Sequence, residues 1–105
     1  MTDLRARAAP AEQPATPGPL RIGPLSVDPP VVLAPMAGVT DGPFRGLCSR
    51  FGAGLYVSEM ITARAVVERN EKTLGMLRFD GSETTRSVQL YGTAPTTMGE
   101  AVRFL

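Results

Sequence analysis

Three short apolar runs recur along the chain, and each is followed by a segment with helical spacing. The runs begin near residues 31, 55 and 87. Short apolar runs of this kind are typical of strands that are buried in a parallel sheet. The segments between the runs place apolar side chains three and four positions apart, as amphipathic helices do. The order of strand and helix, repeated three times, therefore predicts an α/β fold.

The first run, residues 31–34, leads into a turn that contains both proline and glycine. Pro35 has no N–H for a strand ladder, so it should lie at the end of the strand rather than in its middle. Gly38 permits a positive φ or the close approach of a ligand. Ligands of α/β proteins bind at the carboxyl ends of such strands. The residues alone leave two interpretations open: a ligand-binding turn and an ordinary connection between strand and helix.

A helix is predicted after this turn, beginning near Pro43 with Asp41 or Gly42 as its cap. Apolar side chains at i, i+3, i+4 and i+7 predict one buried face, made of Phe44, Leu47, Cys48 and Phe51. The outward side is expected to include Arg45, Ser49 and Arg50. On this pattern Cys48 is a buried packing residue rather than a reactive thiol.

The second predicted strand, residues 55–60, carries a carboxylate near its carboxyl end. Glu59 would be costly to bury without a partner. It could cap the next helix, contact a neighbouring strand or face a pocket. A structural role in hydrogen bonding is favoured over a role in catalysis.

The third predicted strand, residues 87–92, alternates in a way that separates its two faces. Val88 and Leu90 should meet the helices that cover the sheet, so Gln89 should lie on the opposite face, inside a barrel or at its mouth. A buried amide offers two donors and an acceptor that need partners. Neighbouring backbone groups are the partners that the residues alone favour, and a bound ligand with complementary groups is the alternative.

The remaining segments complete the later units. Residues 61–67, 70–77 and 95–105 are predicted to be helical, and residues 79–82 have the composition of a surface turn. Ala94 stands where a capping residue is usual, so Thr93 is expected to cap the last helix.

The N-terminal part has a different composition. Residues 1–30 contain seven of the ten prolines. Residues 1–19 are expected to be a disordered tail, because they carry too few apolar side chains to offset the entropy of ordering. Residues 20–30 are expected to form a short hairpin-like lead-in across Gly23 and Pro24. Residues 31–105 then form the α/β part.

Composition limits the classes of function. The 105 residues have 43% hydrophobic content and a formal charge of +1, which is ordinary for a soluble globular protein and gives no support for electrostatic capture of nucleic acid. No apolar run approaches the roughly 20 residues of a membrane span. The single cysteine and the lack of histidine argue against a disulfide and a zinc site, so we expect no metal and a cytoplasmic location.

Four short motifs, in the same order, resemble the tRNA-dihydrouridine synthases, in particular the bacterial B-type branch. They lie at residues 33–45, 57–60, 70–73 and 87–92. The resemblance covers roughly residues 31–105. It implies an FMN-binding (β/α)₈ TIM barrel, and since such barrels use ~250 residues, the chain would supply about the first three βα units as a fragment.

The resemblance also implies a reaction and its site. FMN, re-reduced by NADPH, would give hydride from N5 to C6 of specific tRNA uridines, and a cysteine would protonate C5. Pro35, Met36 and Ala37 would contact the flavin, and Gln89 would hydrogen-bond its ring. The protonating cysteine of the family lies in an Asn-x-Gly-Cys-Pro setting expected beyond Leu105. Cys48 does not match it, so no catalytic residue is expected among these residues.

Two alternatives remain open at this stage. Another FMN barrel oxidoreductase, such as a dihydroorotate dehydrogenase or a relative of old yellow enzyme, is disfavoured by the turn at residues 36–41 together with Glu59 and Met60. The second alternative is a non-catalytic remnant or an interaction fragment.

Overall fold

The computed structural model describes residue 11 and residues 15–105. The tail predicted for residues 1–19 lies largely outside these residues. Its described portion from 15 to 19 is exposed and has no regular secondary structure.

A hairpin forms at the residues where the sequence predicts one. Strands β1 (Leu20–Ile22) and β2 (Leu25–Val27) pair antiparallel, with Leu20 opposite Val27. Val27 is fully buried. A Cβ at Gly54 would collide with the carbonyl oxygen of Pro29 and with the side chain of Val27, so the hairpin exit packs directly on the loop before the next long strand.

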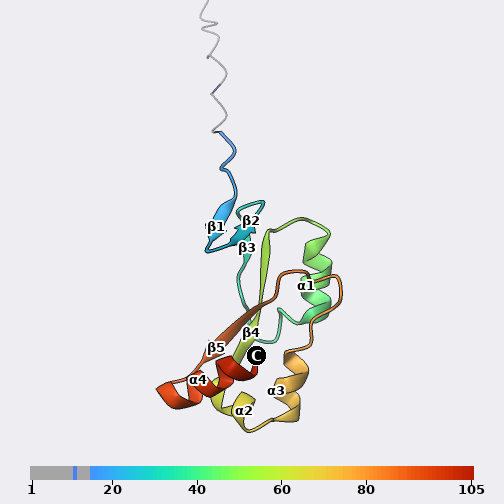
Figure 1. Ribbon diagram of the computed structural model, residues 1–105. Helices are drawn as coiled ribbons and strands as arrows, with labels where there is room; N and C mark the ends of the chain where they lie inside the picture. The colour runs from blue at the N-terminus through green and yellow to red at the C-terminus, as the bar shows by residue number, and fades with distance from the viewer. Residues whose placement is uncertain (1–10, 12–14) are drawn as a thin grey trace, which may run out of the picture.

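The α/β order predicted from the sequence is confirmed (Figure 1). A three-stranded parallel sheet has the order β3-β4-β5, with strands β3 (Val32–Leu33), β4 (Leu55–Thr62) and β5 (Ser87–Tyr91). The helices are α1 (Gly42–Ser49), α2 (Ala63–Val67), α3 (Glu71–Met76) and α4 (Pro95–Phe104). Each strand is the hydrogen-bonded neighbour of the next one along the chain, so the units are added in sequence order.

Side-chain caps set where three of the helices begin. Asp41 accepts a hydrogen bond from the N–H of Phe44 and starts α1, as predicted. Asn70 caps α3 in the same way, and Thr62 caps α2. The predicted helix 61–67 therefore begins two residues later than expected, because Ile61 and Thr62 still pair with β5.

The expectation that Thr93 caps the last helix is wrong. Ala94 occupies the cap position of α4, with no side-chain hydrogen bond to the helix. Pro95 at the first helical position lacks an N–H, which leaves one fewer donor to satisfy and supplies a φ suited to a helix start.

The core lies between the sheet and helices α2 and α4. Ile61, Ala63, Val66 and Ala101 are buried together. Val88 and Leu90 pack against them, which confirms the predicted alternation of β5. The polar face of that strand points away from this core.

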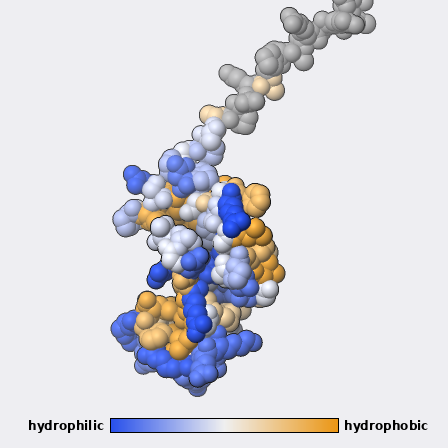
Figure 2. Space-filling model, turned by 90° about the vertical axis from the view of Figure 1, so that its right-hand side faces the viewer, coloured by the Kyte–Doolittle hydropathy of each residue, from blue (hydrophilic) through white to orange (hydrophobic). Residues whose placement is uncertain are grey.

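The predicted burial of α1 is wrong in two respects. Leu47 and Phe51 are exposed, Phe51 by 85%, whereas Arg45 is only 2% exposed. Cys48 is half-buried. Figure 2 views the molecule from the side that carries α1 and α3 in Figure 1, and apolar surface is uncovered there. Arg45 takes the inner position because its guanidinium finds acceptors there, as described below.

The predicted burial of the first strand is also wrong within the described residues. Val31 and Val32 are exposed, since β3 is short and pairs only with β4. Among the residues that the structure describes, no helix is long and apolar enough to cross a membrane, and no group of three metal-ligating side chains is found.

The contact at Gly54 leads to a stability prediction. Gly54→Ala should lower the free energy of unfolding by about 1–3 kcal/mol, because the added methyl group overlaps backbone atoms that cannot rotate away. Gly46→Ala is the matched control. No atom lies within 4 Å of a Cβ there, so a helical alanine should stabilise the chain by about 0.5–1 kcal/mol. Urea unfolding followed by circular dichroism measures both, and equal effects would contradict the packing described.

Candidate functional site

The face of the sheet opposite the core exposes a small set of apolar and amide side chains at the carboxyl ends of the strands. Met60 and Tyr91 are each about half exposed, and Gln89 is exposed. Met60 lies directly opposite Gln89 in the ladder between β4 and β5. The thioether and the amide are therefore neighbours on one surface.

The turn after β3 reaches the same end of the sheet (Figure 1). Pro35 is half-buried, while Met36 and Ala37 are exposed. Gly38 has a φ of +73°, and a Cβ there would meet no atom within 4 Å. The turn thus presents small and apolar groups beside open space.

The backbone of this turn is held from within by Thr40, which is fully buried. The N–H of Met36 donates to Thr40 Oγ1 at 3.0 Å, and the Thr40 hydroxyl donates back to the carbonyl oxygen of Met36 at 3.2 Å. The same carbonyl accepts the N–H groups of Val39 and Thr40, both at 3.0 Å. Both backbone polar groups of Met36 are thus bonded inside the turn, while its side chain remains exposed.

Glu59 ties the turn to the middle strand of the sheet. Its Oε1 accepts a hydrogen bond from the N–H of Gly38, 21 residues earlier in the chain. The hydrogen bond expected of this carboxylate is therefore present, and the preference for a structural over a catalytic role stays a prediction.

A β-bulge in β4 explains how Glu59 reaches the turn. The ladder pairs Val57 with Ser87 and then Met60 with Gln89, so β4 contains one extra residue. Bulges of this kind redirect side chains, and they are frequent next to active sites. Here the irregularity falls at Ser58 and Glu59.

The bulge also sets the position of Ser58, whose role was not anticipated from the sequence. It is 1% exposed. Its Oγ donates to the carbonyl oxygen of Glu59 at 3.1 Å and accepts the N–H of Gln89 at 3.4 Å. The small hydroxyl side chain in the middle of a predicted buried strand could have indicated a hydrogen-bonding role. Two adjacent residues of β4 therefore bond the turn after β3 on one side and β5 on the other.

Arg45 is the other residue that sequence reasoning missed. Its Nη1 donates to the carbonyl oxygen of Thr40 at 2.8 Å, its Nε donates to Glu83 Oε1 at 2.7 Å, and its Nη2 approaches Glu83 Oε2 and the carbonyl oxygen of Arg78, each at 3.4 Å. The guanidinium also lies 5.0 Å from the centre of the Phe79 ring. Helical spacing alone gives no indication that a charged residue, rather than Leu47, lies on the inner side.

The pKa of the Glu83 carboxyl reports on this pair. Burial raises this pKa, and so does the nearby charge of Asp80. The hydrogen bond from Arg45, the hydrogen bond from the backbone N–H of Asp80 and the positive charge of Arg45 lower it, and together they outweigh the two raising effects. The pKa therefore lies below its ordinary value of 4.5.

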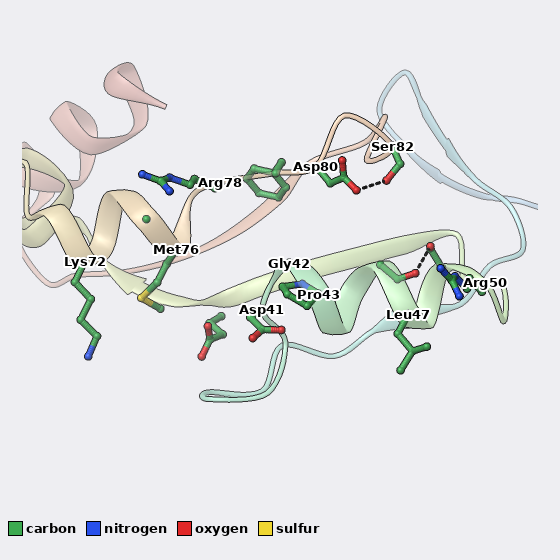
Figure 3. Close-up of a pocket in the computed structure, with 15 residues that line it drawn as sticks. Asp41, Gly42, Pro43, Leu47, Arg50, Lys72, Met76, Arg78, Asp80 and Ser82 are labelled. Atoms are coloured by element: carbon green, nitrogen blue, oxygen red, sulfur yellow. Dashed lines mark hydrogen bonds between the residues drawn. The ribbon is translucent and has the colours of Figure 1, made fainter.

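A broad groove is bounded on one side by α1 and on the other by α3 and the turn that follows α3 (Figure 3). Pro43, Leu47 and Arg50 line it from α1 and its end, and Lys72 and Met76 line it from α3. Pro35, Met36, Ala37 and Gln89 do not line it, but Glu59 and Asp41 do, and Glu59 also bonds the N–H of Gly38. The groove therefore borders the turn at residues 36–40 through Glu59.

Cys48 is placed far from that face by the topology. The turn at residues 36–40 leads into α1, which runs back toward the amino ends of the strands (Figure 1). Cys48 lies in the last turn of α1, at the opposite end of the sheet from Met36. Its thiol is therefore unsuited to act on a ligand held at the carboxyl ends of the strands.

Comparisons with known proteins agree on one family. The family model described as "Dihydrouridine synthase (Dus)" matches residues 32–105. A Mycobacterium tuberculosis protein named "Probable tRNA-dihydrouridine synthase" is 50% identical over 82% of this chain, which is 24% of that protein. Proteins named "tRNA-dihydrouridine synthase B" are 48% identical in Xanthomonas axonopodis pv. citri and 46% identical in Pseudomonas aeruginosa. These alignments cover 81% and 80% of this chain and 26% and 25% of those proteins.

This chain thus spans about a quarter of the length of these curated relatives. No solved structure is significantly similar to it.

The lowered pKa of Glu83 predicts how stability depends on pH. A carboxyl whose pKa is lower in the folded state contributes stability that is fully present above its unfolded pKa and is lost as the pH falls through the folded pKa. Wild-type stability should therefore decline below about pH 4.5, and Glu83→Gln should remove part of that slope. The control Glu68→Gln breaks an exposed ion pair with Arg64 and should change the slope little. Urea unfolding between pH 3 and pH 7 tests this, and identical slopes for wild type and Glu83→Gln would contradict it.

Proposed function

The chain belongs to the dihydrouridine synthase family, and on that premise we propose that it forms part of an enzyme that reduces uridines of tRNA to 5,6-dihydrouridine. The observation that carries the proposal is the family match over residues 32–105. This range contains both the turn after β3 and strand β5. Relatives that are 46–50% identical over most of this chain are named as synthases of this kind.

We propose a TIM barrel as the complete fold, of which these residues form about three units. The support is topological. Strands β3, β4 and β5 are parallel, adjacent in chain order and separated by helices, as successive units of a (β/α)₈ barrel are. Their carboxyl ends carry the exposed side chains described above, and barrel enzymes place their active sites at that end.

FMN is the cofactor that we propose for this face, and the residues present suit it. Met36 and Ala37 offer apolar contact, Gly38 adds no side chain, and the exposed amide of Gln89 has the donors and acceptor that a flavin pyrimidine edge complements. Pro35 would complete the contact at the end of β3. When bound, FMN supplies the hydride for the C5–C6 bond of uridine, and NADPH restores the reduced cofactor.

The residues of this chain would bind and orient rather than transfer protons. The turn is bonded through its backbone by Thr40 and Glu59, which leaves Met36 and Ala37 free to contact the ring. Cys48 lies at the wrong end of the sheet for the proton donor. We expect that donor in an Asn-x-Gly-Cys-Pro setting after a further strand. A formal charge of +1 gives these residues little attraction for tRNA, so we expect its basic surface elsewhere in the protein.

The proposed role of Gln89 can be tested in the protein at its full natural length. Gln89→Ala should weaken FMN binding by about 1–3 kcal/mol, because a polar group of the ring would lose its partner. Cys48→Ser is the matched control and should retain FMN affinity and activity, with only a packing cost. Quenching of flavin fluorescence gives the affinity. An unchanged affinity in Gln89→Ala would remove this residue from the site, and loss of uridine reduction in folded Cys48→Ser would overturn the assignment of the thiol.

A second prediction concerns residues 1–105 by themselves. We expect them to bind FMN weakly and to reduce no uridine, because barrel enzymes often complete their phosphate site with the loops after strands seven and eight. A flavin on the exposed face of three strands would also remain open to water. The visible spectrum with added FMN, and an assay for dihydrouridine on unmodified tRNA with NADPH, test this. A stoichiometric yellow complex that forms dihydrouridine would contradict the prediction, and the lack of activity in the full-length protein as well would favour a non-catalytic role.

A further inference from the structure

We propose that Arg45 is a positioning residue for the cofactor site, which it serves by fixing the turn at residues 36–40 against the segment that leads into β5. The inference rests on the proposed function, since the turn carries Met36 and Ala37, and β5 carries Gln89. Arg45 itself is buried, and its hydrogen bonds reach neither Met36 nor Gln89. Its effect would be indirect.

The first link runs from the guanidinium to the turn. Nη1 of Arg45 donates to the carbonyl oxygen of Thr40 at 2.8 Å, in a fully buried contact. The hydroxyl and the N–H of Thr40 in turn bond the backbone of Met36. Because Arg45 bonds the carbonyl oxygen of Thr40, it helps to hold the backbone of Met36 in place.

The second link runs from the guanidinium to the segment before β5. Glu83 accepts from Nε of Arg45 at 2.7 Å through one oxygen, and its other oxygen accepts the N–H of Asp80 at 2.9 Å. The carbonyl oxygen of Arg78 lies 3.4 Å from Nη2. One planar group thus connects α1 and the turn that precedes it to residues 78–83, which lie more than 30 positions further along the chain.

Stability alone is a poor reason for this arrangement. Burying an ion pair costs desolvation free energy, and apolar replacements of similar volume are often as stable. Leu47 of the same helix is exposed while Arg45 is buried, so α1 does not use this apolar side chain for the contact. A guanidinium offers several donors in a fixed plane, which suits the task of holding separate segments in one geometry.

The consequence concerns the fraction of molecules whose turn is ready to bind. The apparent affinity for a ligand falls in proportion to the population of the competent conformation. If the loss of Arg45 lowers that population to about a tenth, the apparent Kd for FMN rises about tenfold. The fold as a whole need not lose stability for this to happen.

The test uses the full-length protein and two changes of different kind. Arg45→Lys keeps the charge but loses the planar set of donors. The double variant Arg45→Met/Glu83→Leu replaces the buried pair by apolar side chains. Arg64→Lys is the matched control, because Arg64 forms an exposed ion pair with Glu68. Hydrogen–deuterium exchange measured on a peptide covering residues 36–41, the midpoint of thermal unfolding, and titration with FMN are compared for each protein.

Faster exchange confined to residues 36–41 and an FMN Kd raised about tenfold, with a thermal midpoint near that of the wild type, would support the proposal. Arg64→Lys should change none of the three. The proposal would be overturned if both Arg45 variants showed unchanged exchange and unchanged FMN affinity. It would also be overturned if their exchange were faster by the same factor at residues 36–41 and in the rest of the chain. If exchange at residues 36–41 is faster in the Arg45 variants but no protein binds FMN, including the wild type, the link from Arg45 to the turn is supported and the proposed function is refuted.

The unmodified protein provides a measurement that does not depend on whether the variants fold. Coupling between two sites is reciprocal. Added FMN should therefore slow exchange at residues 78–83 as well as in the turn. Slowing in the turn without any change at residues 78–83 would overturn the proposal.

Discussion

The buried guanidinium of Arg45 imposes a constraint on much of the first βα unit. A charge that is 2% exposed must be paired and hydrogen-bonded, or its burial would cost several kcal/mol. Here the hydrogen-bond partners come from the turn after β3 and from residues 78–83. The helix that carries the arginine begins directly after that turn. Satisfying one side chain therefore fixes the turn and the start of α1 against a segment more than 30 residues further along the chain.

The bulge in β4 acts on the same turn from the opposite direction. In a regular strand, neighbouring side chains point to opposite faces. The extra residue at Ser58 and Glu59 changes this alternation, so that one side chain bonds Gly38 and the other bonds the backbone of Gln89. The turn is thus held by a carboxylate from the sheet and by a guanidinium from the helix. Both contacts are made to backbone atoms, which leaves the side chains of the exposed face free for a ligand.

Local chemistry made much of this fold predictable from the sequence. The apolar runs gave the three parallel strands, Asp41 and Pro43 gave the start of α1, and the alternation of β5 placed Gln89 opposite the core. The burial of Arg45 and the bulge at Ser58 were not predictable in this way. Each depends on a partner far along the chain, and neither helical spacing nor strand alternation contains that information. The exposure of Leu47 has the same origin, because the arginine takes the inner side of the helix.

The use of charge in this chain bears on how a nucleic acid would be recognised. Glu59, Arg45 and Glu83 are charged residues whose contacts are internal, and they bond backbone groups or each other. The formal charge of +1 over 105 residues leaves no large excess of basic groups to attract phosphates. In these three residues, charge serves geometry rather than attraction. If the proposed function holds, affinity for tRNA and the placement of a cofactor would depend on different parts of the protein, and a change at Arg45 should affect the second and spare the first.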